Sequence, residues 1–396
     1  MKMSKKSKIL WAALTPAAAL LAAFLILCIV TMSAVSPVFL GRVLSHWDSS
    51  VTDYKVFPER VIRKSDKPFV YGKSLNAALS EVKVNNESLS EFVKSTDTTS
   101  FIIVKNDEII YEQYANGYTE NSVNTSFSMA KSVVSLLVGR AVEEGYIKSV
   151  KQPISDYIAE FENKPIGKTT IEQLLLMRSD IAYDEDKFLW FGDDTLTYWH
   201  SDLRSLALSH TELKEQNGKF LYNNYHPLLL GIILERSTGR GVSEFFESEI
   251  WRKIGAEHDA SWSLDSDKSG FEKMESGINF RAADFIKIGS AVLHGGYWNG
   301  ERIISEEWLQ ASTQCEIICA DYKNTFLEGK NTGYKYMWYC TPSEKSGKDI
   351  VAWGKSDQIM YISPANDTVI LRTGKTDGGV SNWVEALKKL VAEVIF

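Results

Sequence analysis

The sequence predicts an α+β (α/β sandwich) fold, with an antiparallel β-sheet flanked by N- and C-terminal helices and an inserted, mainly helical lobe. Strand-like alternation of apolar residues occurs at 101–114 and again at 334–373. Between them, at about 150–315, helical periodicity and loops dominate. Strands from both ends of a domain can share one sheet, against which the helical region packs as a second lobe. A binding site is expected in the crevice between the lobes.

The N-terminal residues 1–35 predict a cytoplasmic basic stub followed by a transmembrane signal-anchor. Lysines between Lys2 and Lys8 precede an uncharged stretch at 9–30, and a membrane-spanning helix needs about 20 apolar residues. Basic flanks stay in the cytoplasm, so the rest of the chain is expected to be periplasmic or extracellular. Cleavage near 33–34, where small residues occur, remains an alternative.

The first elements after the anchor follow from local patterns. Residues 36–98 are mixed and polar and are expected to form a linker and lead-in, followed by a globular domain at 99–396. A hairpin is expected with its turn at 105–107. Apolar periodicity predicts a largely buried helix at 128–144, and a short capped helix is expected at 170–177.

The later elements are two helices, four strands and a closing helix. The helices at 227–236 and 282–293 each end near glycine. The turn Pro364-Ala365-Asn366-Asp367 separates two of the strands. The predicted strands are 334–340, 350–353, 358–363 and 368–373, and the closing helix is 380–394.

Composition narrows the class of protein. With a net charge of -7, the chain has no electrostatic reason to bind nucleic acid. Its six histidines are scattered, without CxxC or HExxH spacing, so neither a metal nor another cofactor is expected. Cys340 could pair with Cys315 or Cys319 in an oxidising compartment, or these residues could be buried free thiols.

The first chemical motif is Ser128-Met129-Ala130-Lys131 at the start of a predicted helix. Residues three apart share a helix face, so the lysine amine can reach the serine hydroxyl. The helix dipole favours the negative charge that develops during serine attack, and the free N–H of Ser128 can stabilise an oxyanion. The same spacing at Ser80 and Lys83 lacks a buried helix, and a serine at a helix start is commonly only a cap.

The second motif is Tyr222-Asn223-Asn224, just before the helix at 227–236. A tyrosine near a lysine can take the serine proton, and Asn224 can orient the lysine or bind a substrate amide. Similar Tyr-x-Asn triplets begin at Tyr114 and Tyr322, so a buried tyrosine that caps a turn is the structural alternative.

These motifs together resemble the class C β-lactamase and penicillin-binding-protein-like serine hydrolases. The resemblance rests on Ser-Phe-Ser-Met-Ala-Lys-Ser-Val at 126–133 and Phe-Leu-Tyr-Asn-Asn at 220–224, and it continues in order from about 100 to 395. Within the family, the chain looks most like the esterase and aminohexanoate-dimer (nylon-oligomer) hydrolase branch. The resemblance implies Ser128 as nucleophile, Lys131 as its activator, Tyr222 as general base and acid, and Asn224 as a substrate or lysine contact.

The third family motif, Lys-Thr-Gly, is replaced by Ala352-Trp353-Gly354 followed by Lys355. Esterase-like members also lack the lysine, so the departure argues against a dedicated β-lactamase. The resemblance implies the N–H of Lys355 as the second oxyanion donor, while Trp353 could contact substrate or pack within a strand. Arg372-Thr373-Gly374 and His294-Gly295-Gly296 imitate the motif and rank second.

The leading functional hypothesis is hydrolysis of an ester or amide in a small molecule or peptide through a Ser128 acyl-enzyme. One alternative is a DD-peptidase or β-lactamase acting on peptidoglycan or penicillins. Another is a non-catalytic penicillin-binding-like sensor. Aromatic residues crowd the segment after the short helix, which favours an apolar substrate; they are Tyr183, Phe188, Trp190, Phe191, Tyr198 and Trp199.

Overall fold

The computed structural model describes residues 18–19, 36–46, 48–184, 192–314, 331–343 and 347–394. Nearly all of the predicted anchor at 9–30 lies outside these ranges. Among the described residues, no helix is both long and apolar enough to cross a membrane. Membrane attachment and an extracytoplasmic location therefore remain predictions.

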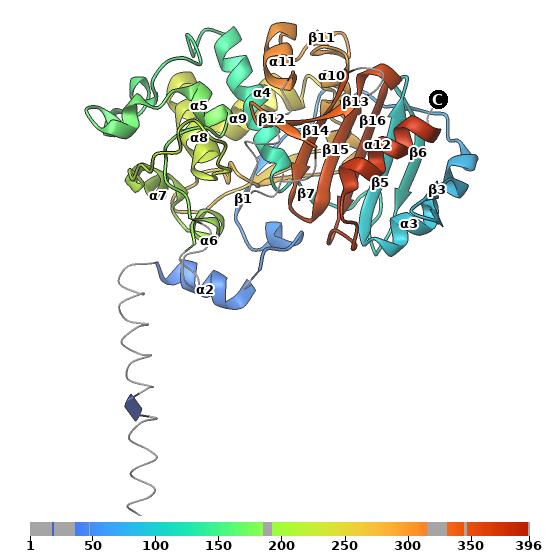
Figure 1. The fold of residues 1–396 in the computed structure, drawn as a ribbon, viewed down its shortest axis with the longest axis horizontal. Coiled ribbons are helices and arrows are strands. Elements are labelled where there is room, and N and C mark those ends of the chain that lie inside the picture. Colours follow the sequence, from blue (N-terminus) through green and yellow to red (C-terminus); the bar gives the residue numbers. More distant parts are fainter. Residues whose placement is uncertain are drawn as a thin grey trace, which may run out of the picture.

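The main sheet has eight strands (Figure 1). Seven come from both ends of the domain, as the sequence predicts, and the edge strand β2 comes from the lead-in, which the sequence did not predict. Neighbouring strands are antiparallel except for the edge pair β2 and β6, which is parallel. In spatial order the strands are β12 (Gly333–Lys335), β13 (Trp338–Ser343), β14 (Gly347–Gly354), β15 (Gln358–Ser363), β16 (Thr368–Gly374), β5 (Thr98–Lys105), β6 (Glu108–Tyr114) and β2 (Gly72–Lys73).

The predicted single strand at 334–340 is wrong, because the chain forms two strands there. β12 and β13 pair as a tight hairpin whose turn is Tyr336-Met337. Both turn residues have positive φ, 43° and 63°, which two-residue hairpin turns require and which Asn or Gly usually supplies. An aromatic and a methionine gave no turn signal, so the break could not be found from the sequence.

Helices cover both faces of the main sheet (Figure 1). On one face, α3 (Leu89–Ser95) and α12 (Trp383–Val394) meet through Phe92 and Trp383, whose rings are 5.1 Å apart. On the other face, α4 (Met129–Glu143) and α10 (Ala282–Leu293) pack on the central strands. α10 falls inside the predicted lobe range of 150–315 but packs on the sheet.

The helical lobe is organised around α8 (Tyr225–Thr238), which is apolar on nearly all sides and packs against α4, α5 and α7. Because α4 touches both α8 and the sheet, its N-terminus lies where lobe and sheet meet. The remaining helices here are α5 (Ile171–Leu175), α6 (Asp193–Trp199), α7 (Leu203–Ser209) and α9 (Val242–Phe246). Peripheral elements are α11 (Glu306–Thr313) and the hairpins β3–β4 (Lys83–Val84, Glu87–Ser88) and β10–β11 (Tyr297–Trp298, Glu301–Arg302).

A second, four-stranded sheet joins the lead-in to the domain. Its order is β1 (Glu59–Ile62), β8 (Ala260–Ser263), β9 (Ile278–Phe280) and β7 (Asn124–Thr125). The lead-in thus supplies β1 to this sheet and β2 to the main sheet. Its first helix, α2 (Pro37–His46), packs on α6.

Cys340 is buried in β13 and is disulfide-bonded. The free-thiol alternative is therefore excluded for this residue. The other two cysteines considered for pairing, Cys315 and Cys319, lie outside the described residues.

Candidate active site

Ser128 lies at the N-terminus of α4, directly after the short strand β7. The intervening Phe127 has φ of 41°, a left-handed conformation that costs about 1–3 kcal/mol and persists only where the surroundings impose it. Hydrogen bonds of the preceding residue, Ser126, help to hold this conformation. The Ser126 N–H donates to the Ile278 carbonyl at 2.8 Å, and its hydroxyl donates to the Ser276 carbonyl at 3.1 Å. The turn places the Ser128 N–H among the helix amides that have no intrahelical acceptor.

Lys131 lies one turn further along α4, with 2% of its surface exposed. Its Nζ is 2.9 Å from Ser128 Oγ and 2.9 Å from the Glu275 carbonyl oxygen. Among the described residues, no carboxylate forms an ion pair with it. The sequence-predicted contact between lysine and serine is therefore present, and the loop that carries Glu275 fixes the lysine amine in place.

A buried ion pair stabilises that loop. Lys273 Nζ is 2.8 Å from Glu275 Oε1, and both side chains are 2% exposed. Burial lowers the pKa of Lys273, an effect that Glu275 opposes. Glu275 Oε2 has no hydrogen-bond partner among the described residues.

Tyr222 comes from the loop before α8, and the structure brings it to Lys131. Lys131 Nζ lies 4.9 Å from the centroid of the Tyr222 ring. The ring also packs edge-on against Tyr334 of β12, at 6.3 Å between centroids. Tyr222 and Ser128 line the same cavity, so the three predicted catalytic residues converge.

Asn224 occupies the N-cap position of α8, and its side chain bonds to residues of the helical lobe and not to the helix amides. Its Nδ2 donates to Tyr183 Oη at 3.0 Å and to Thr197 Oγ1 at 3.2 Å. No hydrogen bond joins Asn224 to Lys131 in the described part of the chain. Asn224 lines the cavity, and its amide oxygen Oδ1 is buried without a hydrogen-bond partner among the described residues.

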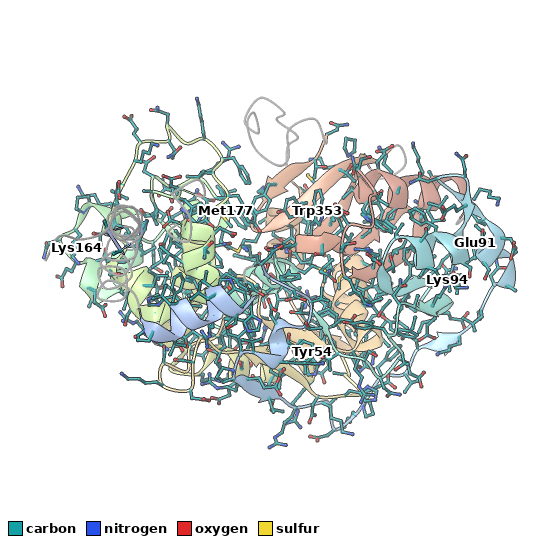
Figure 2. The ribbon with its side chains drawn as sticks, turned by 90° about the horizontal axis from the view of Figure 1, so that it is seen from below. Tyr54, Glu91, Lys94, Lys164, Met177 and Trp353 are labelled. Atoms are coloured by element: carbon teal, nitrogen blue, oxygen red, sulfur yellow. The ribbon has the colours of Figure 1, made fainter. Side chains whose placement is uncertain are left out.

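The third motif lies at the end of β14, against the start of α4. A Cβ at Gly354 would lie 2.6 Å from the Ser126 carbonyl oxygen and 2.8 Å from the Ser128 nitrogen. Only glycine lets the end of β14 lie this close to the start of α4. The close contact places Lys355, the next residue, beside Ser128. Trp353 is 8% exposed, donates to Asp357 Oδ1 at 2.6 Å and also lines the cavity. Trp353 therefore both packs against its neighbours and forms part of the cavity wall. Figure 2 labels it among the strands of the main sheet.

The turn after the third motif is held by Arg372. Its buried guanidinium donates to the carbonyls of Ser356 and Asp357, which both have positive φ, and to Thr96 and Thr376. Burial lowers the pKa of Arg372 to about 10. The segment Arg372-Thr373-Gly374, which resembles the third motif, thus stabilises the turn beside the site but does not line the cavity. His294 instead stacks on Trp298 and contacts Asp107 at 2.7 Å, next to a different surface hollow.

The cavity has a volume of about 620 Å³ and lies where the sheet meets the lobe. A smaller hollow of about 110 Å³ adjoins it. The structure adds wall residues that sequence reasoning missed. Most are polar residues whose local sequence does not distinguish them from other surface positions, and one, Tyr339, is a buried strand residue. They are Asp48, Ser49, Asp194, Tyr339, Ser356, Asp357, Lys375, Thr376 and Asp377.

Charge in the cavity is mixed. Desolvation raises the pKa of the Asp194 carboxyl, while Lys355 and Lys131 oppose the shift. Of the aromatic residues expected near the site, Tyr183 binds Asn224, and Tyr198 and Trp199 line the smaller hollow. Phe188, Trp190 and Phe191 lie outside the described residues. In the described ranges, no group of three or more His, Cys, Asp or Glu could hold a metal ion.

The fold and the order of the motifs define a β-lactamase-type hydrolase, and the chain belongs to the β-lactamase family, whose model matches residues 87–385. It is 25% identical over 311 residues to the 6-aminohexanoate-dimer hydrolase of Paenarthrobacter ureafaciens, covering 74% of this chain and 77% of that protein.

Solved structures share the fold. A Bacillus anthracis protein assigned as a 6-aminohexanoate-dimer hydrolase aligns with a TM-score of 0.75 and 21% identity, over 88% of this chain and 92% of that one. A class C β-lactamase aligns with a TM-score of 0.58 and 14% identity, over 76% and 91%. The resemblance inferred from the motifs is confirmed.

Proposed function

We propose that this protein is a serine hydrolase that cleaves an ester or amide bond in a small molecule or peptide through an acyl-enzyme on Ser128. The observation that carries the proposal is the 2.9 Å contact between Lys131 Nζ and Ser128 Oγ at the N-terminus of α4. A hydroxyl held against a buried amine and beside free helix amides is arranged for attack on a carbonyl.

The proposed reaction has two halves. Tyr222, as a phenolate beside the Lys131 ammonium, takes the proton of Ser128 while Oγ bonds to the substrate carbonyl carbon. The N–H groups of Ser128 and Lys355 stabilise the oxyanion, and the leaving alcohol or amine departs with a proton from Tyr222. Water then attacks the acyl carbon and gives one proton to Tyr222. The bond between the acyl carbon and Ser128 Oγ breaks, Tyr222 returns that proton to Oγ, and the acid is released.

Two features favour an amide over a simple ester. Asn224 lines the cavity, and a small shift of its side chain would let the buried, unpartnered amide oxygen accept a hydrogen bond from a substrate N–H, which a simple ester lacks. The curated relative is named for the hydrolysis of a 6-aminohexanoate dimer. A dedicated β-lactamase is disfavoured because Trp353 stands where that class carries the threonine of Lys-Thr-Gly.

The test uses the full chain in detergent with p-nitrophenyl esters from acetate to octanoate and the matching p-nitroanilides. We expect turnover in the wild type, none in Ser128→Ala, and a loss of about 10²–10⁴-fold in Tyr222→Phe. The chain length that gives the highest kcat/KM defines the preferred acyl group.

Activity that survives in Ser128→Ala would refute Ser128 as the nucleophile. Rapid labelling by a fluorescent penicillin without ester turnover would instead support the DD-peptidase or β-lactamase alternative. A fluorophosphonate probe that leaves Ser128 unmodified would favour the non-catalytic sensor.

A further inference from the structure

Part of the cavity wall comes from outside the matched family region. Asp48 and Ser49 line both the main cavity and the smaller hollow, together with Ser128 and Lys355. The family match begins only at residue 87. The lead-in that precedes the domain is therefore built into the site.

The lead-in is fixed to the elements that surround the nucleophile. A small apolar cluster, separate from the main core, consists of Phe39, Val43, Phe57 and Trp199. The hydroxyl of Tyr198 in α6 donates to Asp53 at 2.9 Å, and Lys273 Nζ lies 4.5 Å from the Phe57 ring. These contacts hold the lead-in against α6 and against the ion pair that supports Lys131. Figure 2 views the molecule from below the orientation of Figure 1 and labels Tyr54 of the lead-in, near the junction of lobe and sheet.

At the cavity, the lead-in meets the third motif through an ion pair. Lys355 Nζ lies 2.5 Å from Asp48 Oδ1 and 2.7 Å from Ser49 Oγ. The hydrogen bond from Lys355 lowers the pKa of the Asp48 carboxyl. The side chains of Lys355 and Asp48 are 47% and 77% exposed, and exposed pairs of this kind contribute only about 0–1 kcal/mol. A ligand can displace such a contact.

We propose that Asp48 is an internal counter-ion of Lys355 and makes the pocket select against acyl groups that end in a carboxylate. With Asp48 in place, an anionic acyl chain meets a Lys355 whose charge is already balanced, and it also meets the carboxylate of Asp194 on the same wall. Without Asp48, the Lys355 ammonium is free to bind such a chain beside the nucleophile. The inference rests on the proposed hydrolase function for its effect on turnover, but not for its effect on binding.

Binding is tested first, because it needs no catalysis. The probe is adipate, titrated calorimetrically into the full chain as wild type, Asp48→Asn, Lys355→Gln and the double variant. We expect Asp48→Asn to bind adipate at least fivefold more tightly than the wild type, and the double variant to lose this gain. Because Asp48 is exposed, melting temperatures should be unchanged, which checks the fold.

Turnover is then compared between two matched six-carbon esters, p-nitrophenyl hexanoate and mono-p-nitrophenyl adipate. Asp48→Asn should raise the adipyl-to-hexanoyl ratio of kcat/KM at least fivefold, and the double variant should not. Asp377→Asn is the charge control, since it removes a carboxylate from the same wall without contacting Lys355 in the described structure. It should raise the ratio by less than twofold.

The two proposals fail in different ways. If Asp48→Asn binds adipate no better, or if the gain persists without Lys355, the counter-ion role is overturned while hydrolysis of the hexanoyl ester is unaffected. If no variant turns over either ester but the binding gain appears, the hydrolase proposal fails and the counter-ion role stands.

Discussion

At the scale of single residues, Gly354 controls the distance between the sheet and the nucleophile. We expect Gly354→Ala to reduce kcat by at least 100-fold and to lower the melting temperature by a few degrees, because overpacking of this kind costs about 1–3 kcal/mol. An added methyl would press on the Ser126 carbonyl and the Ser128 nitrogen and shift the oxyanion donors. The measurement is steady-state kinetics on the best ester of the panel.

The control for this substitution is Gly41→Ala. A Cβ at Gly41 in α2 meets nothing within 4 Å, so kinetics should stay at the wild-type level. A Gly354→Ala enzyme with unchanged kcat would show that strand β14 does not set the oxyanion geometry.

The chemical character of each residue explains why some residues of the candidate site could be predicted from the sequence and others could not. Ser128, Lys131 and Tyr222 have distinctive chemistry and flanks, and the structure brings them together. Asn224 was expected to contact the substrate or the lysine. Its Nδ2 donates to Tyr183 Oη and Thr197 Oγ1, and contact with a substrate stays a prediction. Its hydrogen-bond partners depend on how α6 and the loop at Tyr183 pack, which no local pattern encodes.

At the scale of elements, α8 carries a buried histidine that makes the lobe sensitive to acid. His226 bonds to Ser179 Oγ through Nε2 at 2.6 Å, and complete burial lowers its pKa to about 3. In the unfolded chain the pKa is near 6.5. Below pH 6.5 the unfolded chain therefore binds a proton that the folded chain does not, so stability falls as the pH decreases from 6.5 towards 3.

We expect the wild type to lose about 2 kcal/mol of unfolding free energy between pH 6.5 and 5 from this group, at about 1.4 kcal/mol per pH unit. His226→Gln keeps a polar group near Ser179 but does not titrate, so its unfolding free energy should depend less on pH over this range. Urea unfolding of both proteins at several pH values measures the difference. Parallel pH profiles would contradict the assignment.

Element boundaries show a related contrast. The hairpin at β5–β6 and the helices α4 and α10 were found from alternation, periodicity and glycine stops. The hairpin at Tyr336-Met337 was missed because tertiary packing, rather than turn-forming residues, imposes its positive φ values.

At the scale of the whole molecule, the lead-in forms its own apolar cluster beside the main core. We expect Phe57→Ala to open the lead-in locally. Loss of a buried Phe costs about 3 kcal/mol or more, which corresponds to at least 100-fold faster hydrogen exchange of the α2 amides. Exchange in β15 and β16 should be unchanged.

The matched control is Phe101→Ala in β5, where the side chain is fully buried in the main core. It should lower the global melting temperature instead of opening α2 selectively. If the α2 amides of Phe57→Ala exchange as slowly as those of the wild type, the small apolar cluster does not hold the lead-in in place.

The sequence alone determined the fold class, the family and the three candidate catalytic residues. These rest on local information: alternation and periodicity decide strands and helices, and serine, lysine and tyrosine carry their chemistry in short motifs. Tertiary structure alone decided the walls of the cavity. Asp48, Asp194 and Lys375 come from segments far apart in the chain, and their placement follows from the packing of α2 on α6 and of the sheet on the lobe. A polar residue in a loop has no local signature of the surface it will face, because that surface forms only when distant segments bury their apolar sides together.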